Sequence, residues 1–173
     1  MANQLAIMVF RACATVLLAL LIVSSLGALA ADEKPPPPRC PVCSNVIAAA
    51  ESVVVTDFRA PKDTTYCGLF CALKQMAEKY PASRAIAHSP ISGNEVRIIR
   101  TGARWAIVPT TAVFLILDDP QLPPAQRWRV FDRQARYIQF LSLHRELLKY
   151  QPRPTRLPEL IRLLTPPKVG AHP

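Results

Sequence analysis

The spacing of apolar residues first predicts a pair of strands followed by a helix. Residues 51–58 (ESVVVTDF) are β-branched and typical of a strand, and TTYCG (64–68) continues as a second strand after the turn at 59–63. Across 69–80 apolar side chains recur with the three- and four-residue spacing of one helix face, ahead of Pro81. The residues of that face are Leu69, Ala72, Leu73, Met76 and Tyr80. This spacing assigns Met76 to the core.

The second half of the chain repeats the alternation of strands and helices. Four further strands are predicted at 94–100, 104–109, 111–119 and 127–131, and a long helix at 132–150 with Asp132 as its N-cap. The apolar stripe expected on this helix comprises Ala135, Ile138, Phe140, Leu141, Leu143, Leu147 and Leu148. The order of elements predicts an α+β fold made of two small strand–helix units, with proline-rich termini.

The N-terminus has the pattern of a secretory signal peptide. Residues 1–30 place one positive charge, Arg11, before an apolar run and end in Ala-Leu-Ala. An uncleaved membrane anchor is the alternative, although the strictly apolar run is shorter than the ~20 residues that span a bilayer. We therefore expect a periplasmic or secreted protein, which is tethered to the membrane if the segment is retained.

Prolines delimit the remaining organisation of the chain. Residues 31–38 are expected to be an extended proline-rich spacer, 39–150 the folded metal-binding domain, and 151–173 a proline-rich tail. Within the tail a short helix is predicted at 157–164, with Pro158 in its first turn. Its leucine and isoleucine side chains are expected to dock on the body or on a partner.

The charge balance limits the class of partner. The formal net charge is +9, but the basic residues are spread along the chain, with one cluster from Arg127 to Arg145, and are not interleaved with aromatic residues. For an exported chain we therefore expect no nucleic-acid partner. A solvated basic surface favours an anionic partner or a membrane face instead.

Four of the five cysteines lie within one window of 32 residues, as Cys40, Cys43, Cys67 and Cys71, whereas Cys13 lies in the N-terminal apolar run. A C-x2-C knuckle places two thiolates on a tight turn, where both reach one ion about 2.3 Å away. Cys67 ends a predicted strand and Cys71 falls in the first turn of a helix, where the helix dipole is expected to lower the thiol pKa. Four such sulfurs suit tetrahedral Zn(II), or Cu(I) bound by a subset of them.

The residues around these cysteines resemble the TRASH and YHS treble-clef metal modules. Those modules have a C-P-x-C knuckle, a hairpin that ends in an aromatic residue and a cysteine, a further cysteine, and a helix that closes near an aromatic residue and proline. CPVC at 40–43, Tyr66-Cys67, Cys71 and Tyr80-Pro81 fall on those positions, within residues 39–81. The resemblance implies a treble-clef-like module with four cysteine ligands.

The overall plan resembles the exported NosL-type copper accessory proteins, which support maturation of nitrous oxide reductase. The segment from Arg104 to His144 (RWAIVP…RWRVFDRQARYIQFLSLH) looks like their second strand–helix unit. The resemblance implies a copper or zinc chaperone whose partners are the metal ion and an acceptor metalloenzyme or membrane assembly. The chain departs from the pattern at Ser44-Asn45, where Gly-Met usually stands, and lacks a second-unit methionine and a lipid-anchoring cysteine. Only the four cysteine ligands are therefore carried over.

Other interpretations of the cysteines stay open at this point. In an oxidising compartment two disulfides would make the chain a structural or interaction protein without metal, and a redox-active C-x2-C pair is a further alternative. His88 is expected in a loop after the first helix, and His144 on the surface of the long helix. The sequence shows no nucleophile elbow, phosphate-binding glycine loop or paired carboxylates, so we do not expect an enzyme.

Overall fold

The computed structural model describes residues 35–164. Contacts divide the chain into two units, Met1–Pro36 and Pro37–Pro173, and every helix and strand described belongs to the second. The signal-peptide prediction for residues 1–30 and the last part of the tail fall outside the described residues. Within the described range, no helix combines the length and the apolar character needed to cross a bilayer.

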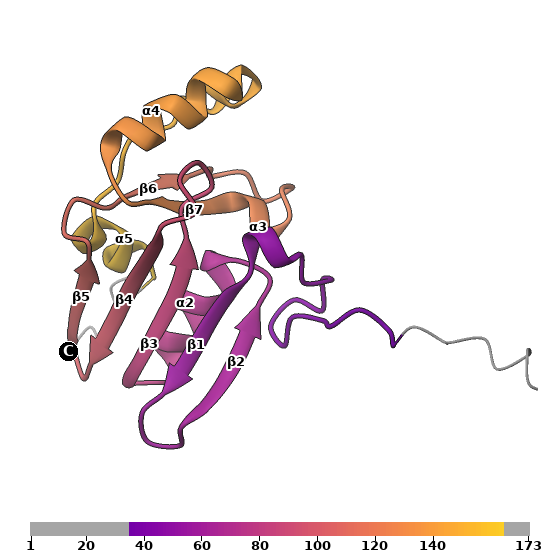
Figure 1. Cartoon of the computed structure of the whole chain (residues 1–173), viewed down its shortest axis with the longest axis vertical. Coiled ribbons are helices and arrows are strands. Elements are labelled where there is room, and N and C mark those ends of the chain that lie inside the picture. Colours follow the sequence, from indigo (N-terminus) through magenta and orange to yellow (C-terminus); the bar gives the residue numbers. More distant parts are fainter. Residues whose placement is uncertain (1–34, 165–173) are drawn as a thin grey trace, which may run out of the picture. The chain divides into compact units, whose positions relative to one another are not determined.

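A five-stranded antiparallel sheet, in the order β2-β1-β3-β4-β5, forms the main layer of this unit (Figure 1). Its strands are β1 (Val53–Asp57), β2 (Lys62–Tyr66), β3 (Ala82–His88), β4 (Glu95–Thr101) and β5 (Arg104–Val108). Helix α2 (Leu69–Glu78) packs on one face of this sheet, and Leu73 and Met76 are fully buried there. The predicted core position of Met76 is therefore confirmed, as is a mixed α+β fold.

Strand β3 was missing from the sequence prediction, although it is the central strand of the sheet. Its burial alternates along the strand, and the inward positions are the small residues Ser83, Ala85 and Ala87. Small inward side chains leave room for α2 to approach the sheet, whereas the larger Ile86 lies on the opposite face. The pattern therefore lacks the large β-branched inward residues by which a strand is recognised from sequence.

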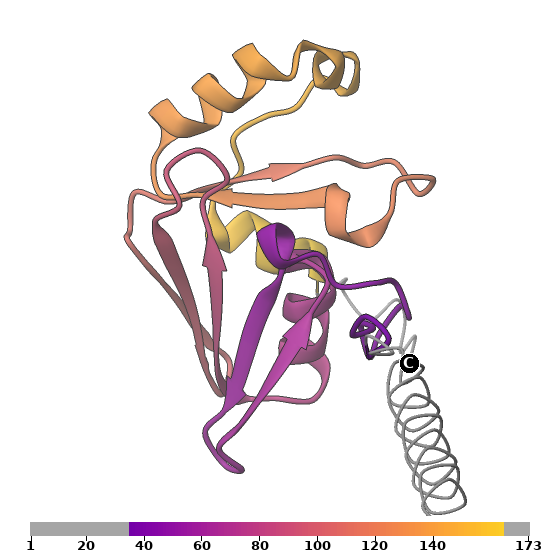
Figure 2. The same ribbon diagram turned by 45° about the vertical axis from the view of Figure 1, so that its right-hand side comes forward.

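A second layer contains the strand pair β6 (Val113–Ile116) and β7 (Trp128–Phe131), joined through the short helix α3 (Pro124–Arg127). Helix α4 (Gln134–Leu143) follows, and then the 3-10 helix η3 (Arg145–Tyr150). Figures 1 and 2 both show the β6–β7 pair between the five-stranded sheet and α4. Strands β4 and β5 join the first sheet, so the second predicted unit retains only the β6–β7 pair and its helix.

The long helix predicted at 132–150 is wrong in its length, and its predicted apolar stripe is only partly buried. It breaks at His144, whose φ and ψ are −121° and 60°, and the chain continues as η3. Tyr137 and Phe140 are the buried residues of α4. Of the predicted stripe, Phe140 is buried and Leu141 and Leu147 pack against the same core. The other four residues are exposed, namely Ala135, Ile138, Leu143 and Leu148. Aromatic packing on Phe131, rather than the aliphatic stripe, fixes which face points inward.

Asp132 is not the N-cap of this helix. The N-cap is Arg133, which makes no side-chain capping hydrogen bond. The Asp132 carboxylate instead accepts hydrogen bonds from Ser92 Oγ (3.0 Å) and Asn94 Nδ2 (2.9 Å) in the loop between β3 and β4. Burial alone works against the ionised carboxylate, but these hydrogen bonds lower the pKa of Asp132 below its usual value. Asp132 therefore ties the start of α4 to the main sheet.

The short helix predicted in the tail is confirmed as α5 (Leu157–Leu164). Leu157 and Leu160 are buried in the same hydrophobic core as α2 and the main sheet. A pair of hydrogen bonds between the backbones of Phe114 and Thr155 (2.9 and 3.0 Å) guides the chain into this position along β6. The start of the tail is thus part of the folded body. A one-turn 3-10 helix, η2 (Ala49–Glu51), precedes β1.

Candidate metal centre

The first cysteine pair lies on a tight loop that precedes β1. A bridge between Arg39 and Val46 closes the loop, and the Cys40 amide donates to the Asn45 carbonyl (2.8 Å). Inside it, the Ser44 amide donates to the Cys40 carbonyl (2.9 Å), and Ser44 adopts a left-handed φ of +60°. The loop thus has the knuckle geometry expected from C-x2-C, with a serine in a backbone conformation that favours glycine.

The second cysteine pair lies where β2 passes into α2. Cys67 directly follows β2, Gly68 is the N-cap, and Cys71 falls in the first turn of the helix. Gly68 has an extended φ of 176°, so its role is spatial: a Cβ here would lie 2.7 Å from the Ala125 Cα of helix α3. A glycine is therefore required for α3 to approach the residues between the two cysteines.

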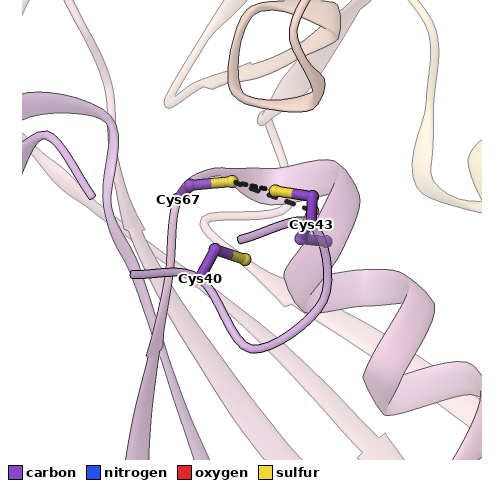
Figure 3. Close-up of side chains that lie close together, drawn as sticks. Cys40, Cys43 and Cys67 are labelled. Atoms are coloured by element: carbon purple, nitrogen blue, oxygen red, sulfur yellow. Dashed lines mark hydrogen bonds between the residues drawn. The ribbon is translucent and has the colours of Figure 1, made fainter. Parts of the chain in front are cut away.

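The four sulfur atoms converge on one point. Every pair of Sγ atoms of Cys40, Cys43, Cys67 and Cys71 lies within 4.8 Å. The Cys43 and Cys67 sulfurs are 3.4 Å apart, and those of Cys67 and Cys71 are 3.8 Å apart. Figure 3 shows the sulfurs of Cys43 and Cys67 pointing toward each other, with that of Cys40 directed to the same side.

This arrangement fits the chemistry of a thiophilic ion. Metal–sulfur bonds of about 2.3 Å in a tetrahedron place the sulfurs about 3.8 Å from one another. The sulfur distances of 3.4 and 3.8 Å are close to that edge, so a tetrahedral ion is accommodated by small side-chain shifts. The sequence prediction that these four cysteines form one group is borne out by their convergence.

Burial differs among the four thiols. Cys40 is 2 % exposed and Cys67 and Cys71 are fully buried, whereas Cys43 is half-buried. Solvent therefore reaches the group through Cys43, on the outer side of the knuckle. The other three sulfurs are enclosed among core side chains of the main sheet and α2.

The thiols also differ in acidity. For Cys40 burial alone would raise the pKa, but backbone amides of Cys67, Val42 and Cys43 hydrogen-bond its sulfur and lower the pKa to about 7. Burial, with contributions from the neighbouring thiols of Cys43 and Cys40, raises the pKa of Cys67 to about 12. A metal ion that binds here would displace the protons from such thiols.

The acidity of Cys71 differs from the sequence expectation. The helix N-terminus was expected to lower its pKa, but burial raises the pKa of the Cys71 thiol well above its usual value. Desolvation of the thiolate outweighs the helix dipole, because Cys71 is fully enclosed. The adjacent Tyr66 phenol also has a raised pKa, because of burial and its hydrogen bond with Tyr80. The site is thus a desolvated thiol cluster backed by a tyrosine pair.

The two histidines in the described part of the chain stay apart from this group. His88 is exposed at the end of β3, where it alternates with the inward residues and so lies on the sheet face opposite α2. His144 stacks on Phe140 and its Nδ1 lies 3.2 Å from Glu146 Oε1. Among the described residues, the metal-binding geometry thus involves cysteines alone.

The sequence analysis missed two residues that shape the centre. Gly68 carried a signal, because a glycine between two cysteines of a strand–helix junction indicates a close approach of another segment. For Ser44 the sequence showed only that serine stands where glycine is usual. That substitution alone did not predict that the backbone keeps a left-handed conformation there. Comparison with protein families, with curated proteins and with solved structures found no match for this chain.

Proposed function

We propose that this chain is an exported metal-binding protein that holds one thiophilic ion with Cys40, Cys43, Cys67 and Cys71. The observation that carries the proposal is the convergence of four sulfurs within 4.8 Å on a junction that is mostly buried. Thiolates in such numbers bind soft or borderline ions in preference to Mg²⁺ or Ca²⁺. The role is binding and transfer, with no catalytic residue assigned.

Zn(II) and Cu(I) are the two ions that this donor set suits. A closed set of four thiolates matches tetrahedral Zn(II). Cu(I) is also thiophilic and would use a subset of the sulfurs, among which Cys43 and Cys67 are 3.4 Å apart. The resemblance of residues 39–81 to TRASH and YHS modules, and of the overall plan to NosL-type proteins, supports a copper or zinc accessory role.

As an accessory factor the protein would deliver its ion to a metalloenzyme by ligand exchange. Cys43 is the half-buried thiol, so an incoming ligand would first replace Cys43 while Cys67 and Cys71 stay anchored at the strand–helix junction. Cys43 would therefore be the one residue of the C-x2-C pair at which transfer of the ion begins, because Cys40 is itself buried. An acceptor metalloenzyme or a membrane assembly would supply the competing ligand.

Competition titration against a chromophoric chelator tests the binding claim, with reduced full-length chain and Zn(II) or Cu(I) added separately. We expect one ion per chain, and no tight binding after all four clustered cysteines are replaced by serine. Cys13→Ser is the matched control, since it removes the one cysteine that is not among the four proposed ligands, and it should bind as the parent does. Tight binding that survives the fourfold replacement would disprove the proposal.

A disulfide-stabilised structural or interaction protein without metal is the second candidate. The observation in its favour is that the Cys43 and Cys67 sulfurs lie 3.4 Å apart, closer than the 3.8 Å between those of Cys67 and Cys71. A disulfide requires about 2.05 Å, so a side-chain shift of either residue would be needed. Reduction would then destabilise the fold by roughly 2–5 kcal/mol for each bridge, without any effect of chelators.

A further inference from the structure

The outer surface of α4 and η3 has an unusual composition for a solvated helix. We call residues 134–150 the α4–η3 arm. On its inner side Tyr137 and Phe140 are buried, and each packs on Phe131 of β7, with ring centroids 5.7 and 5.2 Å away. These aromatic contacts fix the arm on the β6–β7 pair, on the side away from the main sheet (Figure 2).

Three large aliphatic side chains stand in solvent along the arm. Ile138 is 58 % exposed, Leu143 66 % and Leu148 52 %. The other exposed large hydrophobic residues of the described part are scattered singly over different elements, namely Val46, Phe58, Val108 and Leu163. Isolated cases of that kind are normal on a protein surface, whereas three within 11 residues concentrate exposed aliphatic side chains on one segment.

The same stretch carries a net charge of +4 (five basic residues and one acidic residue), out of +9 for the whole chain. Between residues 133 and 153 the basic residues are Arg133, Arg136, Arg145, Lys149 and Arg153. Glu146 is the single acidic residue in that range, and its carboxylate contacts His144 Nδ1 at 3.2 Å. Arg133 also pairs with the neighbouring Asp132 carboxylate at 3.7 Å, so the exposed aliphatic residues are set among a local excess of cations that is only partly compensated.

We propose that the α4–η3 arm binds the surface of a lipid bilayer that contains anionic phospholipid. Aliphatic side chains of a surface helix enter the boundary between headgroups and acyl chains, while arginine and lysine pair with the anionic headgroups. A protein partner fits less well, because the centres of protein interfaces are enriched in aromatic residues, whereas the exposed large hydrophobic residues of the arm are all aliphatic. This inference is independent of the cysteine centre.

A fluorescence experiment on the full chain tests this surface directly. Ile138→Trp introduces an emission probe at an exposed site, and its spectrum is compared with the parent, which contains Trp105 and Trp128. Vesicles of phosphatidylglycerol with phosphatidylcholine are expected to shift the added emission to the blue, and high salt to reverse the shift. Vesicles of phosphatidylcholine alone should leave it unchanged. The difference between the variant and the parent spectra isolates the emission of the residue at position 138 from that of Trp105 and Trp128.

Matched charge variants complete the design. Replacing Arg133, which directly precedes the arm, together with Arg145 and Lys149 of the arm by glutamine should weaken the effect at least about tenfold, because each cation contributes roughly fivefold near an anionic surface. Lys62, Lys74 and Arg104 are exposed elsewhere, so their replacement by glutamine removes the same charge without touching the arm. Circular dichroism verifies that both triple variants remain folded.

Three outcomes would overturn the proposal. The first is an unchanged spectrum with anionic vesicles, and the second is an equal shift with phosphatidylcholine alone. The third is an equal loss in both triple variants, which would show an effect of net charge rather than of this surface. A blue shift that rises with protein concentration in the absence of lipid would assign the arm to contact between two copies instead.

Discussion

Helices α2 and α4 both have ten residues and both follow a strand, yet they are packed very differently. Five residues of α2 are buried, including Cys71 and Met76, whereas α4 buries only Tyr137 and Phe140. Helix α2 lies against a five-stranded sheet, whereas α4 lies against a pair of strands. The first environment can enclose a thiol cluster, and the second leaves aliphatic and basic side chains in solvent.

The comparison teaches that similar strand–helix units can serve opposite purposes. At the start of α2, burial removes water from three thiols and raises the pKa of Cys67 and Cys71. These two thiols therefore keep their protons until a metal ion displaces them. At α4, shallow packing keeps one face free.

The largest effect is expected from the cysteines themselves. Cys71→Ser should weaken binding of Zn(II) by more than about 100-fold, because a buried ligand at the helix start cannot be replaced by water. Cys43→Ser should cost much less, since solvent reaches that position and a water molecule can complete the coordination. Chelator competition on the two single variants measures the difference. Equal losses would show that the exposure of Cys43 has no bearing on metal release.

Truncation of one residue on each helix should separate the two packing environments. Met76→Ala should lower the free energy of unfolding by about 2–5 kcal/mol, because Met76 is fully buried and leaves a cavity. Ile138→Ala should change it by less than about 0.5 kcal/mol, because Ile138 is 58 % exposed. Urea unfolding of the two variants gives both values. A large cost at Ile138 would place that side chain in a packed interior and contradict the exposed arm.

A smaller effect is expected at the junction between the cysteines. Gly68→Ala should destabilise the protein by about 1–3 kcal/mol, because the added Cβ would lie 2.7 Å from the Ala125 Cα and α3 must move. Thermal unfolding measures the change. Gly102→Ala is a useful comparison, because no atom lies within 4 Å of its Cβ position and only the left-handed φ of +62° is affected. A neutral result at Gly68 would mean that α3 is not held against the junction.

The smallest effect should be a gain. Ser44 has a φ of +60°, a conformation that costs a side-chain-bearing residue roughly 1–2 kcal/mol. Ser44→Gly should therefore stabilise the metal-free protein by about 0.5–1 kcal/mol after the greater flexibility of glycine in the unfolded chain is included. Ser44→Ala retains the strain and should give no gain. The same free energy of unfolding for all three proteins would show that the knuckle is not strained at this residue.

The sequence analysis succeeded where apolar periodicity and chemistry agreed. The Leu69–Met76 spacing predicted both the helix and its buried face, and the four cysteine positions predicted their convergence. Helix α5 was predicted with the bounds Leu157–Leu164, because its leucine spacing is equally regular. In each case one set of side chains determines both the local structure and its burial.

The failures have physical reasons in particular residues. Strand β3 was missed because its inward residues, Ser83, Ala85 and Ala87, are small. They allow α2 to pack closely on the sheet, but they lack the large apolar side chains by which a strand is usually recognised in a sequence. The stripe predicted for the helix at 132–150 was right at Phe140, Leu141 and Leu147, but it omitted the buried Tyr137 and included Ile138 and Leu143, which are exposed. Aspartate is a residue type typical of an N-cap, but Ser92 and Asn94 of a distant loop donate hydrogen bonds to the Asp132 carboxylate instead. Such choices depend on tertiary contacts that no local pattern contains.

The most direct test of the central claim is native mass spectrometry of the full-length gene product, isolated without reductant or chelator from cells that express it. A denatured aliquot is measured in parallel to count free thiols. The account predicts one zinc or copper ion for each chain, lost on denaturation to leave Cys40, Cys43, Cys67 and Cys71 as free thiols. A metal-free chain that lacks four hydrogen atoms relative to its sequence mass would show two disulfides and contradict the metal centre.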